Sequence, residues 1–177
     1  LHCVADGAPE APLMLFVHGF PEFWYCWKQQ LAEFGRDYRA VAFDLRGHNL
    51  SDKPEGIAAY RIKPLLEDLR QLIEHLTAGR EDKSCVLVAH DWGGAIAWTF
   101  AAAYPAYVKR LVIINAPHSV PFARTLAHDP KQQAASAYMN FFRLAKATRV
   151  MAENNHERLL KMFCSTVDGH SALSDED

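Results

Sequence analysis

An aspartate stands where the sequence predicts a nucleophile. Residues 88–94 read Val-Ala-His-Asp-Trp-Gly-Gly; they end an apolar run that begins at residue 85 and open a helical pattern at 95–104. This is the strand, sharp turn and helix of a nucleophile elbow, where small residues let the turn close. A carboxylate at its tip, here Asp91, can displace a leaving group at carbon and form an ester. The alternative is that Asp91 only caps the helix by accepting backbone hydrogen bonds.

A second motif lies upstream, at the end of another apolar run. Residues 18–22 read His-Gly-Phe-Pro-Glu and follow the run 13–17. Glycine allows a tight turn there, and the Phe20–Pro21 bond can be cis. Such a turn can aim the Phe20 N–H into a cleft, together with the N–H of Trp92, the residue after the nucleophile. The two motifs therefore predict an oxyanion hole.

Alternating strands and helices must bring these motifs together. Four apolar runs are predicted to be buried parallel strands: 13–17, 40–44, 85–89 and 111–115. Helical patterns lie between them, at 24–34, 63–77 and 95–104. This order predicts a parallel sheet with flanking helices, with sites at the carboxyl ends of the strands. Leu1 is expected inside a further strand, and after Pro117 only helices are predicted, at 121–126, 132–146 and 148–163.

The motifs resemble the epoxide hydrolase branch of the α/β-hydrolase family over nearly the whole chain. The likeness extends to Trp24, Tyr25 and Trp27, to Asp-Leu-Arg-Gly-His at 44–48 with Ser-Asp-Lys-Pro at 51–54, and to Asn-Ala-Pro-His at 115–118. The resemblance implies an α/β-hydrolase fold, with residues 1–117 as the N-terminal part of the core and 118–177 as the first part of a helical cap. It implies neither a metal nor a cofactor.

The resemblance implies hydrolysis of an epoxide to a vicinal diol through an ester on Asp91. An ionised carboxylate attacks without a base, and the departing alkoxide takes a proton. Tyr138, in Ala-Tyr-Met-Asn-Phe-Phe at 137–142, matches the first cap tyrosine of epoxide hydrolases and is expected to be this acid. Its spacing alone also fits a residue that packs on an amphipathic helix. Four residues are expected to line the substrate site: Phe20, Pro21, Trp92 and Tyr138.

Hydrolysis of the ester needs a histidine base with an acidic partner. The histidines after Asp91 lie at 118, 128, 156 and 170, and none follows a late strand pattern. The base, its partner and a second cap tyrosine are therefore expected outside this chain. Residues 168–170, Asp-Gly-His, are predicted to be a loop between cap helices and are assigned no role. The chain begins with Leu1 and ends Ser-Asp-Glu-Asp, like the start of a helix, so we interpret it as a fragment.

Other polar and aromatic residues of the motifs are expected to be structural. His18 and His90 should orient their turns through hydrogen bonds, and Arg46 should tie its loop through an ion pair. His48 should lie at the surface or pack. Burial of aromatic bulk is expected for at least two of three residues, Trp24, Tyr25 and Trp27.

The nearest alternative function is that of a haloalkane dehalogenase, which shares the Asp91 elbow and Trp92. That family places an asparagine after the glycine of the upstream motif to bind halide, whereas Phe20 has no side-chain donor, and Tyr138 would have no role. Fluoroacetate-type dehalogenases usually have arginine in place of Trp92, and Asp91 itself disfavours a serine esterase. A different class is a non-catalytic binding protein built on this fold.

Composition indicates a soluble globular protein. The chain has 177 residues, of which 50% are hydrophobic and 23% charged, and its net charge of −2 gives no sign of nucleic-acid or membrane-surface binding. Its four cysteines show neither metal spacing nor Cys-x-x-Cys, and no apolar run could span a membrane. We expect a cytoplasmic protein whose partners are a small-molecule epoxide and water; the sequence does not indicate an oligomeric state.

Overall fold

The computed structural model describes residues 1–163, 166–167 and 170–171. They belong to two compact units, Leu1–Pro121 and Phe122–Asp177. The first unit contains a five-stranded sheet and both sequence motifs. The second contains short helices and a small hairpin.

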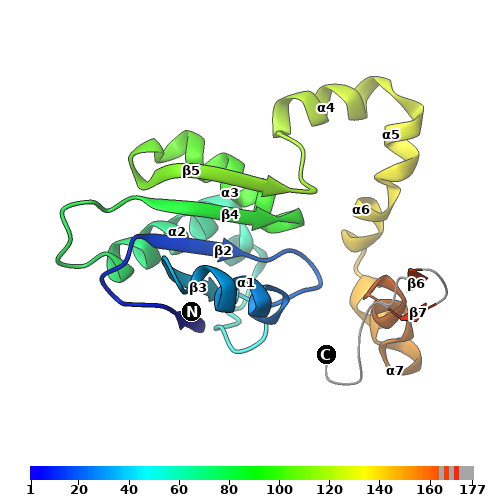
Figure 1. Cartoon of the computed structure of the whole chain (residues 1–177). Helices are drawn as coiled ribbons and strands as arrows, with labels where there is room; N and C mark the ends of the chain where they lie inside the picture. The colour runs from blue at the N-terminus through cyan, green and yellow to red at the C-terminus, as the bar shows by residue number, and fades with distance from the viewer. Residues whose placement is uncertain (164–165, 168–169, 172–177) are drawn as a thin grey trace. The chain divides into compact units, whose positions relative to one another are not determined.

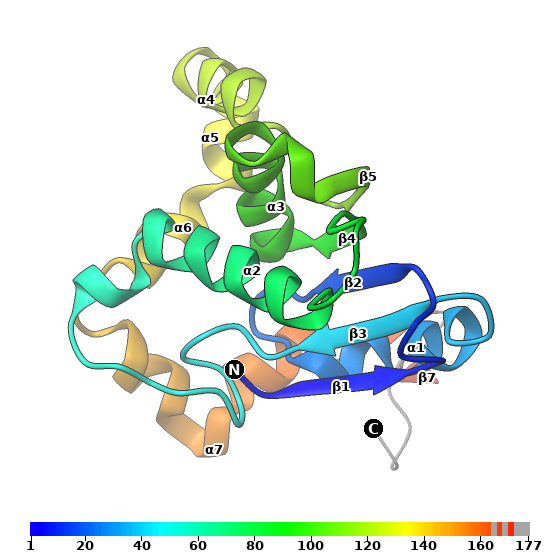
Figure 2. The ribbon, with the colours of Figure 1, turned by 90° about the vertical axis from the view of Figure 1, so that its left-hand side faces the viewer.

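The sheet of the first unit has the strand order β1-β3-β2-β4-β5 (Figures 1 and 2). Its strands are β1 (Cys3–Asp6), β2 (Leu13–Val17), β3 (Arg39–Phe43), β4 (Cys85–His90) and β5 (Val108–Ile114). The four predicted parallel strands are confirmed, although β5 begins earlier than predicted.

The sheet is mixed, because β1 pairs antiparallel with β3. β1 is a short edge strand with partly exposed side chains, and Leu1 precedes it. An antiparallel edge strand on an otherwise parallel sheet is common, since an edge needs only one partner.

Helices cover both faces of the sheet (Figures 1 and 2). A 3-10 turn, η1 (Trp24–Trp27), leads into α1 (Lys28–Phe34) on one face, while α2 (Ile62–Leu76) and α3 (Asp91–Ala103) cover the other. The predicted helix at 24–34 is therefore partly 3-10, and the helix predicted from residue 95 already begins at Asp91. Two further 3-10 turns lie in the connections: η2 (Ile57–Tyr60) and η3 (Pro105–Tyr107).

The core is divided into two layers by the alternation of side chains along the strands. Leu15 and Val17 of β2 pack with α2 and α3, whereas Phe16 packs with Trp27 and Leu31 on the other face. Because helices cover both faces, every residue of β2 is buried, which explains its uninterrupted apolar run. The apolar pattern of α2 is also buried in full: Leu65, Leu66, Leu69, Leu72, Ile73 and Leu76.

The second unit is helical, as predicted, but its helices are shorter. Its helices are α4 (Ser119–His128), which begins in the first unit, then α5 (Pro130–Ala135), α6 (Ala137–Phe142) and α7 (Ala147–Phe163). The continuous helix predicted at 132–146 is wrong, because Ser136 ends α5 and α6 stops at Phe142. Residues 153–156 of α7 leave helical geometry, and two of the three with positive φ are asparagines, which tolerate it.

A small hairpin follows α7. β6 (Thr166–Val167) pairs antiparallel with β7 (His170–Ser171). His170 therefore lies in a strand and not in the predicted loop, while Asp168 and Gly169 lie outside the described residues.

Candidate active site

The two sequence motifs meet at the carboxyl ends of β2 and β4. These strands are parallel neighbours, with Val17 opposite Ala89. The residues that follow, 18–22 and 90–91, therefore emerge at the same edge of the sheet. This is the edge at which parallel sheets place their sites.

Asp91 occupies the tip of the sharp turn between β4 and α3. Its φ of 48° lies in the left-handed region, which aspartate tolerates better than most residues. His90 occupies the N-cap position of α3, and Asp91 is the first helical residue. The Asp91 carboxylate binds the other motif instead: the Phe20 N–H donates to Asp91 Oδ1 at 3.0 Å. Asp91 is therefore not the helix cap that the alternative interpretation predicts.

The elbow is pressed against the upstream turn at two glycines. A Cβ on Gly93 would lie 2.3 Å from the carbonyl oxygen of His18 and 2.7 Å from that of Val17. A Cβ on Gly19 would lie 2.6 Å from the Cβ of Asp91. Only glycine allows such a close approach, which explains the small residues around the nucleophile position.

The peptide between Gly19 and Phe20 is held at both of its polar groups. Its carbonyl, Gly19 O, accepts hydrogen bonds from His18 Nδ1 at 2.7 Å and from the Glu22 N–H at 3.3 Å. Its N–H, on Phe20, donates to Asp91. Because the C=O and N–H of a planar peptide point in opposite directions, fixing the carbonyl aims the N–H at the carboxylate. The next bond, Phe20–Pro21, is cis, the geometry that the sequence allows.

His18 is fully buried, and its contacts identify its tautomer. Nε2 accepts a hydrogen bond from the Leu45 N–H at 3.0 Å, so the ring proton lies on Nδ1, which donates to Gly19 O. Burial lowers the pKa of His18 to about 4, so the ring is neutral at neutral pH. The prediction that His18 orients its turn is confirmed.

Two large apolar residues of the motifs, Phe20 and Trp92, are exposed. The side chains of Phe20 and Trp92 are 42% and 46% exposed. Large apolar groups left exposed beside a polar centre commonly mark a binding site. The combination of carboxylate, N–H donor and apolar rim suits an apolar electrophile.

The α/β-hydrolase fold family model matches residues 12–156 of the chain. The chain belongs to the α/β-hydrolase family. Two relatives of this α/β-hydrolase are epoxide hydrolase 4 of Mus musculus, 40% identical over 169 residues, and epoxide hydrolase 1 of Caenorhabditis elegans, 43% identical over 181 residues. The alignments cover 95% and 100% of this chain but 46% and 44% of the relatives. The chain thus spans about half the length of the curated relatives it matches.

Solved structures agree with this membership. The epoxide hydrolase of Bacillus megaterium in complex with an inhibitor has a TM-score of 0.85 and 43% identity, covering 96% of this chain and 60% of that one. A mutant of an epoxide hydrolase from the same organism, complexed with its product (R)-3-[1]naphthyloxy-propane-1,2-diol, also has a TM-score of 0.85, with 45% identity over 91% of this chain and 55% of that one.

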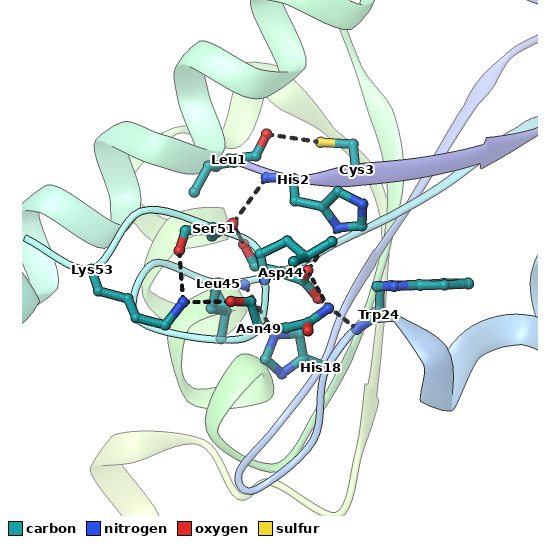
Figure 3. Close-up of polar contacts among 11 residues, drawn as sticks. Leu1, His2, Cys3, His18, Trp24, Asp44, Leu45, Asn49, Ser51 and Lys53 are labelled. Carbon is teal, nitrogen blue, oxygen red and sulfur yellow. Dashed lines mark hydrogen bonds and ion pairs between the residues drawn. The ribbon is translucent and has the colours of Figure 1, made fainter. Parts of the chain in front are cut away.

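The loop after β3 of this α/β-hydrolase is joined by hydrogen bonds to the upstream turn through His18 and Trp24 (Figure 3). The buried Asp44 accepts hydrogen bonds from the Trp24 N–H at 2.9 Å, from His2 Nδ1 at 2.7 Å and from Asn49 Nδ2 at 3.0 Å. The next residue, Leu45, is the one that donates to His18. The carboxylate of Asp44 therefore fixes the loop that fixes the His18 tautomer.

Side chains farther along the same loop close it on itself. Ser51 Oγ donates to the carbonyl of Asp44 at 2.6 Å, and Lys53 donates to the carbonyls of Asn49 and Ser51 (Figure 3). His48 packs against the ring of His18, with centroids 4.9 Å apart, as its expected packing role requires.

The predicted ion pair of Arg46 is confirmed, and its partner is Asp68 on α2. Arg46 Nε and Nη2 donate to the two carboxylate oxygens of Asp68 at 2.6 and 2.5 Å. Arg46 also donates to the carbonyl of Ala59 at 2.9 Å. The bidentate pair ties the loop after β3 to the helix layer.

The aromatic residues after the upstream turn pack as expected. Trp27 is buried against Phe16, with ring centroids 5.2 Å apart, and the half-buried Trp24 and Tyr25 meet edge to face at 5.5 Å. A hollow of about 210 Å³ lies beside them, lined by Glu22, Cys26, Trp27, His90 and Ile114.

Tyr138 belongs to α6 of the second unit. Its ring meets that of Phe142 edge to face at a centroid distance of 6.0 Å, and its side chain is 54% exposed. The tyrosine thus packs along its helix and keeps about half of its surface accessible. Both expectations for Tyr138, a packing residue and an acid, are compatible with this environment.

Within the described part of the chain, no three His, Cys, Asp or Glu side chains gather into a metal-binding group. No described helix is long and apolar enough to cross a membrane.

The sequence motifs did not indicate that Glu22 is a site residue. Its carboxylate binds both the Gly19 N–H and His90 Nδ1, which places it between the two motifs. The available signal was its position directly after the Phe20–Pro21 turn. Its partner, His90, lies in the other motif, so no local pattern could reveal the pair. The prediction that His90 orients its turn through a hydrogen bond is confirmed.

The stability of the first unit should decrease as the pH falls from about 6.5 to about 4, because of His18. The unfolded chain binds a proton at an ordinary histidine pKa, whereas the folded chain binds it only near pH 4. Stability from the neutral ring is therefore full above the unfolded pKa and is lost as the pH falls towards the folded one, by on the order of 3 kcal/mol.

Urea unfolding at about pH 7 and about pH 4.5 checks this, with His18→Gln as the control. The glutamine amide oxygen can still accept from the Leu45 N–H but does not titrate. The free energy of unfolding should fall more in the wild type than in His18→Gln, and equal decreases would contradict the prediction.

Proposed function

We propose that the protein hydrolyses epoxides to vicinal diols, with Asp91 as the nucleophile. The proposal depends on one observation above all: the left-handed Asp91 at the elbow, with the Phe20 N–H bound to its Oδ1. An ionised carboxylate in this position needs no base to attack carbon. Relatives named epoxide hydrolases, and a similar structure that holds a diol product, support the same chemistry.

The first half-reaction forms an ester. Oδ1 is engaged by the Phe20 N–H, so Oδ2 is the atom that attacks. A bond forms between Oδ2 and one epoxide carbon, the C–O bond of the ring breaks, and the ring oxygen leaves as an alkoxide. Tyr138 donates its phenolic proton to that oxygen. Phe20, Pro21 and Trp92 line the proposed substrate site, and the exposed rings of Phe20 and Trp92 favour an apolar epoxide.

The second half-reaction hydrolyses the ester. Water loses a proton to a general base and adds to the ester carbonyl carbon, and Oδ1 becomes an oxyanion that the N–H groups of Phe20 and Trp92 stabilise. Collapse of this intermediate releases the diol and restores the Asp91 carboxylate. His18 cannot accept the proton of the water, because both of its ring nitrogens are bonded. The role of general base for this water is assigned to no histidine of the chain.

Two further expectations belong to the same proposal. Residues 118–177 form the first part of a cap that carries Tyr138. The compactness of the unit Phe122–Asp177 supports this expectation. The location is cytoplasmic, which the free thiols of Cys3, Cys26 and Cys85 support.

Incubation with styrene oxide at neutral pH, followed by intact-mass measurement and peptide mapping, tests the proposal. We expect an adduct of one epoxide on Asp91. Burial raises the pKa of the Cys85 thiol to about 12 and raises that of Cys3, so these two thiols stay protonated and react slowly, whereas Cys26 is exposed. Mapping therefore separates the specific ester from nonspecific alkylation.

An alkyl bromide, used in parallel, separates the hydrolase from a dehalogenase. Labelling of Asp91 by the bromide but not by the epoxide would favour the dehalogenase. Protein whose near-ultraviolet circular dichroism shows fixed tertiary packing, but that neither reagent labels at Asp91, would overturn the proposed nucleophile and favour a binding protein.

A further inference from the structure

The carboxylate of Glu22 connects the two turns that form the site. Its Oε2 accepts a hydrogen bond from the Gly19 N–H at 3.1 Å and lies 2.9 Å from His90 Nδ1. The Glu22 and His90 side chains are only 21% and 27% exposed. The contact spans 68 positions in the sequence. It joins the same two turns that approach each other closely at Gly19 and Gly93.

The two residues bound by Glu22 each lie one position before a residue of the hydrogen bond between Phe20 and Asp91. Gly19 precedes Phe20, whose N–H binds Asp91, and His90 precedes Asp91 itself. Holding Gly19 and His90 on one carboxylate oxygen therefore sets the separation between the Phe20 N–H and the Asp91 carboxylate. The backbone N–H of Glu22, bound to Gly19 O, fixes the direction of the same peptide.

We propose that Glu22 is a positioning residue that, through His90 and Gly19, aligns the Phe20 N–H with the Asp91 carboxylate. Its effect on Asp91 reactivity rests on the proposed function, whereas its effect on the Phe20 N–H does not. Misplacement of a reacting group by about 1 Å can reduce a rate on the order of 100-fold. Loss of the Glu22 carboxylate should accordingly slow the alkylation of Asp91 roughly 10- to 100-fold.

Two variants of Glu22 separate positioning from folding. Glu22→Ala removes both hydrogen bonds, and the hollow that Glu22 and His90 already line gives water room to replace the carboxylate. Glu22→Gln keeps an amide oxygen that can accept from the Gly19 N–H and from a protonated Nδ1 of His90. The matched control is Glu33→Ala, which removes an exposed glutamate of α1 paired with Arg36 at 3.2 Å.

The first measurement is the amide proton shift of Phe20 in the isotope-labelled protein, with Asp91→Ala as the reference for a lost contact. A hydrogen bond to a carboxylate moves this proton downfield, so Glu22→Ala should shift it towards the Asp91→Ala value. Glu22→Gln and Glu33→Ala should keep the wild-type position. The second measurement is the single-turnover rate of Asp91 labelling by styrene oxide, which should follow the same order.

An unchanged Phe20 shift in folded Glu22→Ala, or a Glu22→Gln shift that matches Glu22→Ala, would overturn the positioning role. An unchanged labelling rate in Glu22→Ala, in a protein whose wild type is labelled, would overturn the link to reactivity. If the wild type takes no label while the Phe20 shift still depends on Glu22, the proposed function fails and the positioning role stands.

Discussion

Replacement of Gly93 by alanine is expected to lower the free energy of unfolding by about 4 kcal/mol or more. The added Cβ would lie 2.3 Å from the His18 carbonyl oxygen and 2.7 Å from that of Val17. Both contacts are with backbone at the end of β2, a strand that is buried along its whole length. No flexible side chain can move aside, so α3 and the sheet must separate.

The sign of this effect is decisive, because helix propensity predicts the opposite result. Alanine stabilises a helix interior by about 1 kcal/mol relative to glycine. Urea unfolding of Gly93→Ala should therefore be compared with Ala102→Gly, at an exposed position of the same helix. Ala102→Gly should cost about 1 kcal/mol at most. A Gly93→Ala protein as stable as the wild type would show that the elbow is not closely packed against β2.

Replacement of Asp91 by asparagine should reduce the rate of epoxide labelling by ~10³-fold or more and leave the fold intact. Asparagine has nearly the same shape, tolerates a positive φ, and keeps an oxygen that can accept from the Phe20 N–H. It lacks the negative charge, so no ionised oxygen is present to attack the epoxide.

Single-turnover labelling with styrene oxide and urea unfolding of the same sample check this prediction together. The free energy of unfolding should stay within about 1 kcal/mol of the wild type. An Asp91→Asn protein that labels at the wild-type rate would show that another residue is the nucleophile, and peptide mapping would identify it.

The sequence predicts those parts of the structure that depend on short segments of the chain. Four apolar runs, each long enough for a buried strand, indicate the parallel strands, and the spacing of leucines indicates α2. The motifs at 18–22 and 88–94 indicate two turns at strand ends, and the structure brings them into contact through Phe20 and Asp91. Local sequence carries this information because strand burial and turn geometry depend on neighbouring residues.

The parts that the sequence does not predict depend on contacts between distant residues. The antiparallel pairing of β1, the Glu22–His90 pair and the Asp68 partner of Arg46 each join segments whose approach is determined by the whole sheet. The interruption at Ser136 was missed for another reason. The residues around it are good helix formers, so propensity alone favours one continuous helix there.

The contact between Phe20 and Asp91 also gives the protein an internal reporter of its own assembly. The two residues are 71 positions apart and meet only because β2 and β4 are paired in register. A collapsed chain that keeps its helices but loses this pairing has an ordinary carboxylate at Asp91, without the donor that aligns it. Under the proposed chemistry, epoxide labelling at Asp91 would therefore count the molecules with a correctly paired sheet in a mixed population, which far-ultraviolet circular dichroism, dominated by helices, would not distinguish.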